Sequence, residues 1–480
     1  MNYKVAVVGA GPGGAVLARE LAARGIDVTI YEKSIYGELG HDWSDAVEFG
    51  ALKEAGLEMP VLEGRQWKGS LVKTAPDGGG IFEKHAVPIL RIYSPGKKTY
   101  REIEFKMITT DRRRLAQELV RQAGGAGAKI KYLHEGRGLL YREKGRADLE
   151  GVEVYGVVVR DLENEEDIEI RADLVVESSG FSAVLRGSLP GYSGLAEPFQ
   201  DSDFALVHRE VRPYRPELED GAIGEGGMAR LIPDHYRYGY QSGYQWTHIH
   251  NEERIDVGAG VKRDSKSEDP RDIIEAFIAE HPAIKAPMIR GGRSLCIVGR
   301  PLSNFVAPGF LVLGDAASTS VPTTGCGVGS AIYAALGAAE VVCEAALENR
   351  NDLRKLWDVN KKFYLESDRG PSLAALSELR IVLQTLSSNE IDLLFEKGLL
   401  DAATLQQAIN GHFSPLPAAG KARALLAGFS VPGILVKLNR AVTSAAKIYD
   451  HYLEYPSSWD AGAFTKWESR ARSLQVEGRD

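Results

Sequence analysis

The most constraining feature of the sequence is a glycine-rich segment that directly follows a short apolar run near the N-terminus. Residues 4–8 form the apolar run, and Gly9-Ala10-Gly11-Pro12-Gly13-Gly14 follows with the spacing G-x-G-x-x-G. Apolar residues then recur at helical spacing until Gly25, and residues 27–31 resemble a second strand. A strand, a glycine turn, a helix and a strand within about 30 residues predict a βαβ unit.

The glycine spacing has a physical reason in dinucleotide binding. Gly9 permits the tight turn, Gly11 lets a diphosphate approach the backbone, and Gly14 lets the helix pack closely on the strand. The phosphates then lie at a helix N-terminus, where free N–H groups and the helix dipole favour anions. A chance glycine turn is the alternative, but it would not explain why strand, helix and acidic residue are all in register.

The acidic residue is Glu32, at the end of the second predicted strand. Its carboxylate can accept hydrogen bonds from ribose hydroxyls and would repel a 2′-phosphate, which favours FAD or NAD over NADP. The residues predicted to bind the cofactor in this unit are Gly9, Gly11, Pro12, Gly13, Gly14, Glu32 and its neighbour Lys33.

Size and composition limit the class of protein. A chain of 480 residues exceeds one hydrophobic core, so two or three lobes are expected. A net charge of −8 argues against nucleic-acid binding. Cys296, Cys326 and Cys343 lack the paired spacing of a metal site or a disulfide framework, so we expect no metal and a reducing cytoplasm. No secretory signal or membrane-length apolar run is recognised.

A second glycine turn lies some 300 residues after the first. The apolar segment 310–313 ends in Gly314-Asp315, and Pro322-Thr323-Thr324-Gly325-Cys326-Gly327-Val328-Gly329 then leads into a long helix. Together with the N-terminal motif, this resembles the FAD-binding fold of aromatic-ring hydroxylases, flavin-dependent halogenases and geranylgeranyl reductases. The resemblance implies that Asp315, after Gly314, binds the ribityl chain of FAD. It also implies that Gly325, Gly327 and Val328 present N–H groups to the flavin ring.

Two further segments are similar to this superfamily. Asp111-Arg112-Arg113-Arg114-Leu115 matches its R-x-x-L pattern at a helix start, which makes Arg112 the expected FAD contact. Three adjacent arginines leave the register open, because Arg113 and Arg114 equally fit a solvated helix start. Ser179-Gly180 resembles the Ser-Gly form of halogenases and some prenyl reductases rather than the Asp-Gly of hydroxylases.

The segment Tyr244-Gln245-Trp246-Thr247-His248-Ile249, followed by Val257-Gly258-Ala259-Gly260, bears on the reaction. It resembles the geranylgeranyl reductase pattern Y-x-W-x-F-P, spacer, G-x-G, whose aromatic pair lines an isoprenoid tunnel. His248 and Ile249 replace the Phe and Pro of that pattern. Tyr244, Trp246 and His248 are therefore the predicted substrate contacts, the alternative being that the aromatic residues only pack a core.

This resemblance implies hydride transfer from reduced FAD to one carbon of a C=C bond, with a proton supplied to the other carbon. His41 is a candidate proton donor because histidine ordinarily titrates near neutrality, although a lone histidine is more often structural. Cys326 lies in the flavin turn, where a small residue would also fit. NAD(P)H bound transiently or reduced ferredoxin are the expected electron donors, since no second G-x-G-x-x-G is present.

The expected fold is an α/β fold: a Rossmann-type FAD-binding domain, a mostly antiparallel β substrate domain and a helical C-terminal region. We assign residues 1–62, 109–190 and 291–350 to the FAD-binding domain, residues 63–108 and 191–290 to the substrate domain, and residues 351–480 to the helical region. Within the helical region, residues 402–449 contain basic residues but no acidic ones. Residues 431–448 predict an amphipathic helix. The basic residues of the stretch 402–449 are Lys421, Arg423, Lys437, Arg440 and Lys447.

That basic helix suggests peripheral contact with anionic lipid, or alternatively a helix docked on the core with basic edges. The sequence therefore predicts a cytoplasmic FAD-dependent oxidoreductase that reduces C=C bonds of a hydrophobic substrate. Peripheral contact with a membrane is compatible with this prediction. Two alternatives remain at this point. One is a flavin monooxygenase that hydroxylates an aromatic or polyketide-like substrate. The other is a non-enzymatic lipid-binding protein, like the GDP-dissociation inhibitors.

Overall fold

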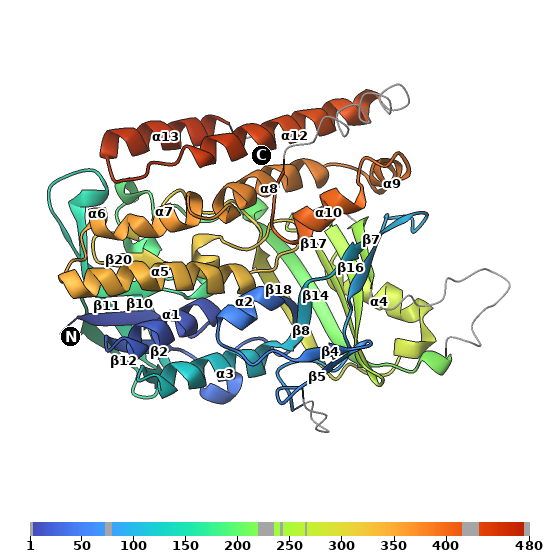
Figure 1. Cartoon of the computed structure of the whole chain (residues 1–480), viewed down its shortest axis with the longest axis horizontal. Helices are drawn as coiled ribbons and strands as arrows, with labels where there is room; N and C mark the ends of the chain where they lie inside the picture. Colours follow the sequence, from blue (N-terminus) through green and yellow to red (C-terminus); the bar gives the residue numbers. More distant parts are fainter. Residues whose placement is uncertain are drawn as a thin grey trace.

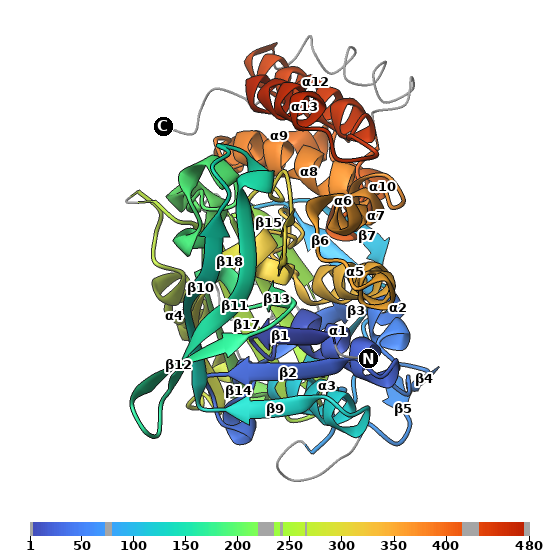
Figure 2. The ribbon, with the colours of Figure 1, turned by 90° about the vertical axis from the view of Figure 1, so that its left-hand side faces the viewer.

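The computed structural model of the chain describes residues 3–72, 79–218, 235–240, 243–264, 266–414 and 432–474. Within these residues, two large sheets lie side by side, and a layer of helices covers one edge of both (Figure 1). The N-terminal strands and the last helices are on opposite sides of the molecule (Figure 2). This arrangement is the α/β fold that the sequence predicts.

The first sheet carries the predicted βαβ unit. Its strand order is β19-β20-β13-β1-β2-β9, and all neighbours are parallel except β19 and β20. β1 covers the residues predicted from the sequence. The strands are β1 (Lys4–Val8), β2 (Asp27–Glu32), β9 (Lys129–Tyr132), β13 (Leu174–Glu177), β19 (Val306–Ala307) and β20 (Phe310–Val312).

Both faces of this sheet are covered, which explains why its central strands are apolar throughout rather than alternating. Helices lie on one face, where α1 contacts both α3 and α5. A three-stranded antiparallel sheet lies on the other face and contacts β2, β13 and β19 (Figure 2). These elements are α1 (Pro12–Ala23), α3 (Arg112–Gly125), α5 (Val328–Glu348), β10 (His134–Glu143), β11 (Val152–Asp161) and β12 (Glu166–Arg171).

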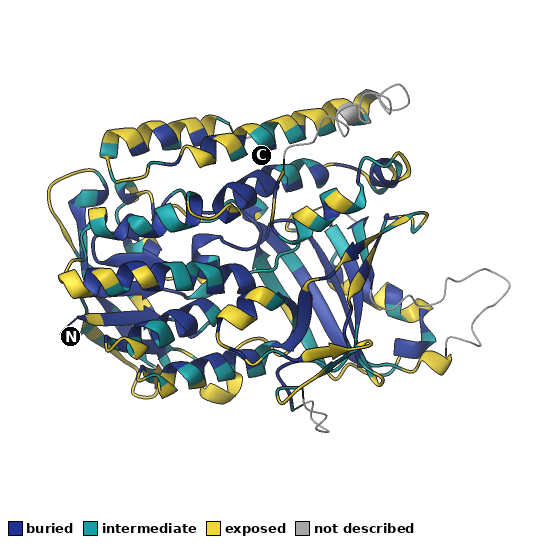
Figure 3. Cartoon of the chain, viewed as in Figure 1, coloured by how far each residue is buried: buried dark blue, intermediate teal, exposed yellow. Residues whose placement is uncertain are grey.

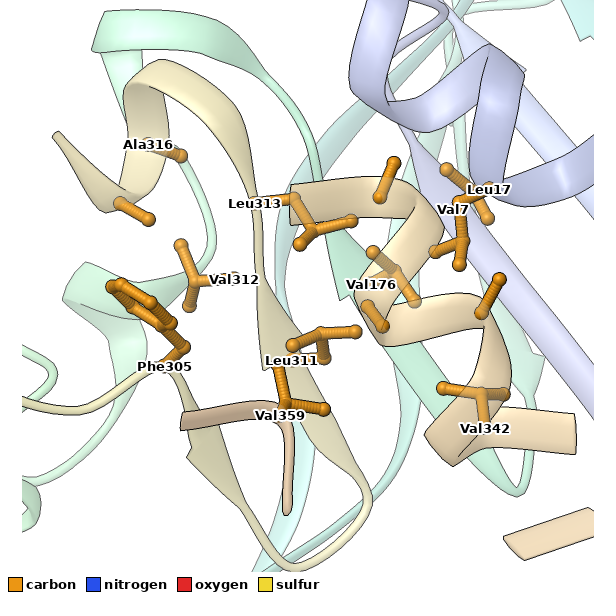
Figure 4. Close-up of a cluster of buried hydrophobic side chains, with 14 of the residues drawn as sticks. Val7, Leu17, Val176, Phe305, Leu311, Val312, Leu313, Ala316, Val342 and Val359 are labelled. Atoms are coloured by element: carbon orange, nitrogen blue, oxygen red, sulfur yellow. The ribbon is translucent and has the colours of Figure 1, made fainter. Parts of the chain in front are cut away.

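Side chains from distant parts of the sequence form the core beneath the helices. Figure 4 shows Val7 of β1 and Leu17 of α1 on one side of Val176, with Leu311 of β20 and Val342 of α5 on the other. All five side chains are buried. The N-terminal motif and the second glycine turn are therefore joined by one hydrophobic core.

α5 is apolar over its whole length. Among the described helices, it is the one that has the length and composition to cross a membrane, and 56% of its most apolar window is buried inside the protein. It contacts α1, α2 (Phe49–Glu54) and α7 (Asp358–Tyr364), as the core helix of a folded domain does.

The second sheet has seven strands in the order β18-β14-β17-β16-β15-β6-β7. All neighbours are antiparallel except β15 and β6, so the predicted mostly antiparallel lobe is confirmed. α4 (Pro270–Glu280) contacts β14 and β17. The strands are β6 (Ile89–Tyr93), β7 (Tyr100–Glu104), β14 (Phe204–Pro213), β15 (His235–Tyr240), β16 (Gly243–Asn251), β17 (Arg254–Lys262) and β18 (Arg290–Ile297).

Two expected boundaries differ from the structure. β18 pairs with β14 in the second sheet, so the substrate lobe continues to Ile297 rather than ending at residue 290. The alternating apolar residues of the segment 168–176 predict one strand, but the segment is divided between β12 and β13, which lie in different sheets. The turn between them contains neither Gly nor Pro, so the sequence carried no signal for it.

Two separate two-stranded sheets accompany the larger ones. β3 (Ser44–Glu48) pairs with β8 (Met107–Asp111), and β4 (Val61–Glu63) pairs with β5 (Gln66–Lys68). Asp111 at the end of β8 accepts a hydrogen bond from the backbone N–H of Arg114 and so caps α3. The β3–β8 pair thus places Asp45 and Arg112 at the junction of the two lobes.

The C-terminal region is helical wherever it is described, and α12 packs along α8. The inner face of α12 is buried through Ala441, Ala445, Ile448 and Tyr452, while its outer face is largely exposed (Figure 3). The helices are α2 (Phe49–Glu54), which lies outside this region, and then α6 (Leu353–Leu356), α7 (Asp358–Tyr364), α8 (Arg369–Leu383), α9 (Ser388–Glu396), α10 (Ala402–Ile409), α12 (Pro432–Leu453) and α13 (Ala461–Ser473).

Candidate active site

A cleft of about 450 Å³ runs along the carboxyl ends of the parallel strands. Residues of the first glycine turn and Asp315 of the second both line it, although 304 positions separate Gly11 from Asp315. Ligands of open α/β sheets bind at this edge. The lining residues among those predicted to bind the cofactor are Gly9, Gly11, Pro12, Glu32, Lys33, Arg112 and Asp315.

The first glycine turn is shaped by close backbone contacts. Gly9 has φ +101°, and a Cβ atom there would lie 2.2 Å from the carbonyl oxygen of Ser178. A Cβ atom on Gly14 would lie 2.3 Å from the carbonyl oxygen of Gly9. A Cβ atom on Gly11, by contrast, would meet no protein atom closer than 3.9 Å. The space beside Gly11 is therefore open to a ligand.

The N-terminus of α1 is suited to an anion. Its N-cap residue is Gly11 and Pro12 follows, so no side chain caps the first free N–H groups. Glu32 lies at the other side of this turn, where its carboxylate accepts hydrogen bonds from the backbone N–H of Ala10 (2.8 Å) and of Ser34 (2.9 Å). A carboxylate has further lone pairs, so Glu32 can also accept from ribose hydroxyls.

The second glycine turn packs directly against Asp315. The Ser320 hydroxyl donates to Asp315 Oδ1 (2.7 Å), and a Cβ atom on Gly327 would lie 2.7 Å from the same oxygen. Burial raises the pKa of Asp315, and the Ser320 hydrogen bond and the Arg112 charge only partly offset it. Gly325 has φ +72°. The backbone angle at Gly325 and the close contact at Gly327 require glycine at both positions, while the flavin contact of Gly325, Gly327 and Val328 stays a prediction.

The structure distinguishes between the three adjacent arginines. Arg112 lines the cleft, and its guanidinium pairs with Asp45 at 3.0 Å. Arg113 lies outside the cleft lining and is 3.6 Å from the exposed Asp42, while Arg114 follows the N-cap without lining the cleft. The predicted register, with Arg112 as the cofactor-side residue, agrees with this geometry.

The three predicted substrate residues alternate along β16 and so share one face of the second sheet. The Tyr244 hydroxyl donates to the carbonyl oxygen of Thr324 in the flavin turn (2.6 Å). The Trp246 ring lies 5.3 Å from that of Tyr244, and Tyr236 is 5.2 Å from His248. A Cβ atom on Gly258 would lie 1.9 Å from the Trp246 ring, so this glycine makes room for the indole.

Two small apolar cavities adjoin this aromatic face. One, of about 30 Å³, lies between Tyr236, Tyr244 and Cys326 of the flavin turn. The other, of about 40 Å³, lies on the far side of Tyr244 and reaches Leu383 of α8. Tyr238, Tyr244 and Thr323 line both cavities. The aromatic face is therefore next to two small, mostly apolar spaces, each much smaller than a typical ligand pocket.

His41 lines the cleft and stacks on Trp43, with ring centroids 4.2 Å apart and planes within 4°. Desolvation of the ring, and secondly the positive charge of Arg112, lower its pKa to about 4. The expectation that His41 titrates near neutrality is therefore wrong. At neutral pH its imidazole is uncharged, which removes the reason for proposing it as a general acid.

The flavin turn has other protonated groups beside it. Burial raises the pKa of Cys296 and of Cys326 to about 12, and it raises that of Tyr244 well above its usual value. Cys296 lies next to Gly325, with its Sγ 3.7 Å from the position of a Cβ atom there. The sequence suggested Cys326 but not Cys296, because β18 is distant in sequence from the turn that it contacts.

Several cleft residues were not predicted. They are Ser178, Ser179 and Gly180 after β13, His134 to Gly136 of β10, and Arg293 and Ser294 of β18. Ser179 is in the segment that resembles the superfamily's Ser-Gly form, so that signal was available. The β10 and β18 residues reach the cleft only through tertiary packing and carry no motif. Among the described residues, no group of His, Cys, Asp and Glu could hold a metal ion.

Comparisons with known proteins agree with this cleft. A family of NAD(P)-binding Rossmann-like domains matches residues 7–47, which is the βαβ unit and the following segment. A curated relative named digeranylgeranylglycerophospholipid reductase, from Sulfolobus acidocaldarius, is 24% identical over 95% of this chain and 94% of its own length. The protein is an FAD-dependent oxidoreductase that is similar to geranylgeranyl reductases.

Other relatives of this reductase-like flavoprotein support the assignment. A digeranylgeranylglycerophospholipid reductase of Methanopyrus kandleri is 28% identical over 73% of this chain and 82% of its own length. Among solved structures, a geranylgeranyl bacteriochlorophyll reductase-like protein of Thermoplasma acidophilum has a TM-score of 0.65 at 20% identity, covering 92% of this chain and 99% of the other.

Flavin-dependent halogenases share the fold. The brominase Bmp2 has a TM-score of 0.58 at 15% identity, and the alignment covers 93% of this chain and 99% of the brominase. These flavoprotein neighbours and the cleft geometry together identify the cofactor as FAD, as predicted. The uncapped α1 N-terminus, the open space at Gly11 and the glycine cradle at Asp315 all fit it.

Proposed function

We propose that this protein reduces C=C bonds in the isoprenoid chains of a polar lipid. The observation that carries the proposal is the position of the aromatic face: Tyr244 is hydrogen-bonded to the flavin turn and also lines both apolar cavities. An isoprenoid chain on this face would have its double bond next to the flavin. The names of the curated relatives supply the lipid class.

The chain's own residues have separate tasks in this reaction. Bound FAD, when reduced, supplies a hydride to one alkene carbon. The glycine turns and Asp315 hold the cofactor, while the apolar cavities exclude water from the reacting carbons. The second carbon requires a proton, and the groups that keep one at neutral pH beside the flavin turn are Tyr244, Cys296 and Cys326. We infer that one of these donates it.

Anaerobic turnover tests the proposal. FAD-loaded protein reduced with dithionite is incubated with a digeranylgeranyl glycerophospholipid, and lipid mass is followed by mass spectrometry. The expected result is stepwise addition of two hydrogens per double bond without oxygen. An enzyme that leaves the lipid unchanged anaerobically but incorporates oxygen into an aromatic substrate in air would be a monooxygenase, and the proposal would be wrong.

The electron donor belongs to the same proposal. NAD(P)H bound transiently in the cleft and reduced ferredoxin both remain candidates. Stopped-flow reduction of the bound flavin by each donor separates them, because only a productive donor bleaches the oxidised flavin absorbance at a rate that can sustain turnover.

We further propose that α12 lets the protein rest on anionic lipid in the cytoplasm. Lys437 and Arg440 are exposed on its outer side near Val436, which is 69% exposed, and Lys437 reaches only the partly buried Glu390 at 3.4 Å. Lys447 is also exposed, while Lys421 and Arg423 lie outside the described residues. Basic residues next to exposed apolar side chains favour a negatively charged membrane surface.

Vesicle sedimentation tests this membrane contact. The wild type is expected to sediment with vesicles that contain phosphatidylglycerol and to be released as salt is raised. Lys437→Gln with Arg440→Gln should reduce binding about thirtyfold, since each basic residue contributes about 1 kcal/mol near such a surface and tenfold corresponds to about 1.4 kcal/mol. The matched control removes two charges from α13 with Lys466→Gln and Arg470→Gln. Equal loss in both variants would mean that only net charge matters.

A further inference from the structure

Arg209 of β14 is a buried guanidinium at the junction of the two lobes, with its side chain 7% exposed. Its Nη1 pairs with Asp45 Oδ1 of β3 at 3.2 Å. Its Nε donates to Asp256 Oδ1 of β17 at 3.2 Å, and its Nη2 donates to Asp256 Oδ2. Arg209 thus joins a carboxylate from the cofactor side to one from the substrate sheet.

The hydrogen bonds continue in both directions from Arg209. On the cofactor side, the other oxygen of Asp45 accepts from Arg112 Nη1 at 3.0 Å, and Arg112 lines the FAD cleft. On the substrate side, Asp256 Oδ2 accepts from Trp246 Nε1 at 2.8 Å. One continuous line of hydrogen bonds, mostly between charged groups, therefore runs from the FAD cleft to an indole on the aromatic face.

Aromatic contacts follow the same path. The guanidinium carbon of Arg209 lies 5.2 Å from the Trp246 ring and 5.9 Å from the Trp43 ring. Trp43 in turn stacks on His41 in the cleft. A cation between two indoles is attracted by both ring faces, and the attraction is strongest where water is excluded. The two indole rings therefore restrain the orientation of the Arg209 guanidinium, in addition to its ion pairs with the two aspartates.

The line is electrically balanced, because it contains two arginines and two aspartates. Burial alone would raise the pKa of Asp45, but Arg209 and Arg112 outweigh burial and lower it. Asp256 is fully buried, so removal of its cationic partner would leave a buried charge without compensation. This line thus depends on Arg209 at its centre.

We propose that Arg209 is a positioning residue for the reaction: through Asp256 it holds Trp246 at a fixed place relative to the cofactor-side Arg112, and so sets how the substrate chain lies over the flavin. The inference rests on the proposed function for the identity of the substrate and for the contact between the substrate chain and Trp246. It assigns to Arg209 no contact with the reacting atoms.

The same strand offers a matched control. Arg212 is 10% exposed and donates to Glu210 and to the carbonyl oxygens of Ile284 (2.7 Å) and Ala286 (2.6 Å). It lies three residues from Arg209 and therefore on the opposite face of the sheet, away from Trp246. Arg209→Met and Arg212→Met remove the same charge and similar hydrogen bonds, so both should lower thermal stability.

Binding of a probe to the oxidised holoenzyme distinguishes a positioning role from a purely structural role. This measurement needs no turnover. The probe is geranylgeraniol in detergent micelles, and the signal is the change in flavin absorbance on titration. Arg209→Met is expected to weaken probe binding at least tenfold while FAD stays bound, and Arg212→Met to bind as the wild type does. Arg209→Lys, which can reach one carboxylate but not span both, should be intermediate. If Arg209→Met does not fold, Arg209→Lys and Asp256→Asn supply the comparison.

The inference is overturned if the Arg209 variants bind the probe like the wild type, or if Arg212→Met weakens binding equally. Turnover with the glycerophospholipid gives a second reading, in which Arg209→Lys should raise KM more than it lowers kcat. Failure of the proposed function would give a different result. The wild type itself would not reduce the double bonds of the lipid, while the probe affinities of the oxidised variants would still follow the predicted order.

Discussion

Gly11→Ala is expected to give a folded protein that no longer retains FAD. The added Cβ atom would meet no protein atom closer than 3.9 Å, so the polypeptide can accept it, but it would occupy the space through which the diphosphate approaches the backbone. We expect a loss of FAD affinity on the order of a hundredfold, or about 2.7 kcal/mol. Titration of the apoprotein with FAD, followed by quenching of flavin fluorescence, measures it.

Two other glycines serve as controls for this variant. Gly187→Ala adds a Cβ atom with nothing within 4 Å and should bind FAD normally. Gly9→Ala should fail to fold, because φ is +101° and the Cβ atom would lie 2.2 Å from the Ser178 carbonyl oxygen. A Gly11→Ala protein that purifies yellow with a full complement of FAD would contradict the assigned diphosphate site.

Glu177→Leu is expected to destabilise the protein by roughly 3 kcal/mol or more, since each buried donor left without an acceptor costs about 1–3 kcal/mol. The Glu177 carboxylate is fully buried at the end of β13. It accepts from the backbone N–H groups of Leu185 (2.7 Å) and Arg186 (2.8 Å) and from the Ser179 hydroxyl (2.9 Å). Urea denaturation of the apoprotein measures the free energy of unfolding.

The loop that these hydrogen bonds hold also lines the FAD cleft, so Glu177→Leu should weaken FAD binding as well. Burial raises the pKa of Glu177, which means that its charge is costly at neutral pH. Glu177→Gln, uncharged and of the same shape, should therefore cost less than Glu177→Leu. Glu169→Leu on the exposed side of β12 should change stability by no more than about 0.5 kcal/mol. Equal effects at both positions would refute the structural role of Glu177.

The cofactor half of the site could be predicted from the sequence because it depends on local backbone geometry. A turn that brings a carbonyl oxygen within 2.3 Å of a Cβ position admits only glycine, and the sequence meets this requirement at Gly9 and again at Gly14. The βαβ unit follows directly, because its strands and helix are adjacent in the chain.

The substrate lobe extends past the expected boundary at residue 290, because β18 belongs to its sheet. At the start of β18, a Cβ atom on Gly291 would lie 2.2 Å from the Arg209 carbonyl oxygen. The glycine is required by the close approach of β14 within a sheet, not by a turn. A single sequence does not distinguish these two uses.

The substrate half depended on contacts between distant segments. The alternation of Tyr244, Trp246 and His248 on one face could be predicted from strand geometry, but Asp256 and Arg209, which hold Trp246, carried no recognisable pattern. The lowered pKa of His41 likewise results from Trp43 and Arg112 packing around it. Such effects of environment follow from the tertiary fold and not from residue type.

The order of the strands in the first sheet has a consequence for biosynthesis. β1 is completed on one side by β13 and, beyond it, β20, and α1 is covered by α5, whose residues follow the N-terminal motif by more than 300 positions. The nucleotide-binding element therefore lacks the packing of β13, β20 and α5 during the synthesis of most of the polypeptide. FAD can be captured stably only after α5 has emerged, and nascent chains that stall earlier should depend on chaperones to shield the exposed apolar face.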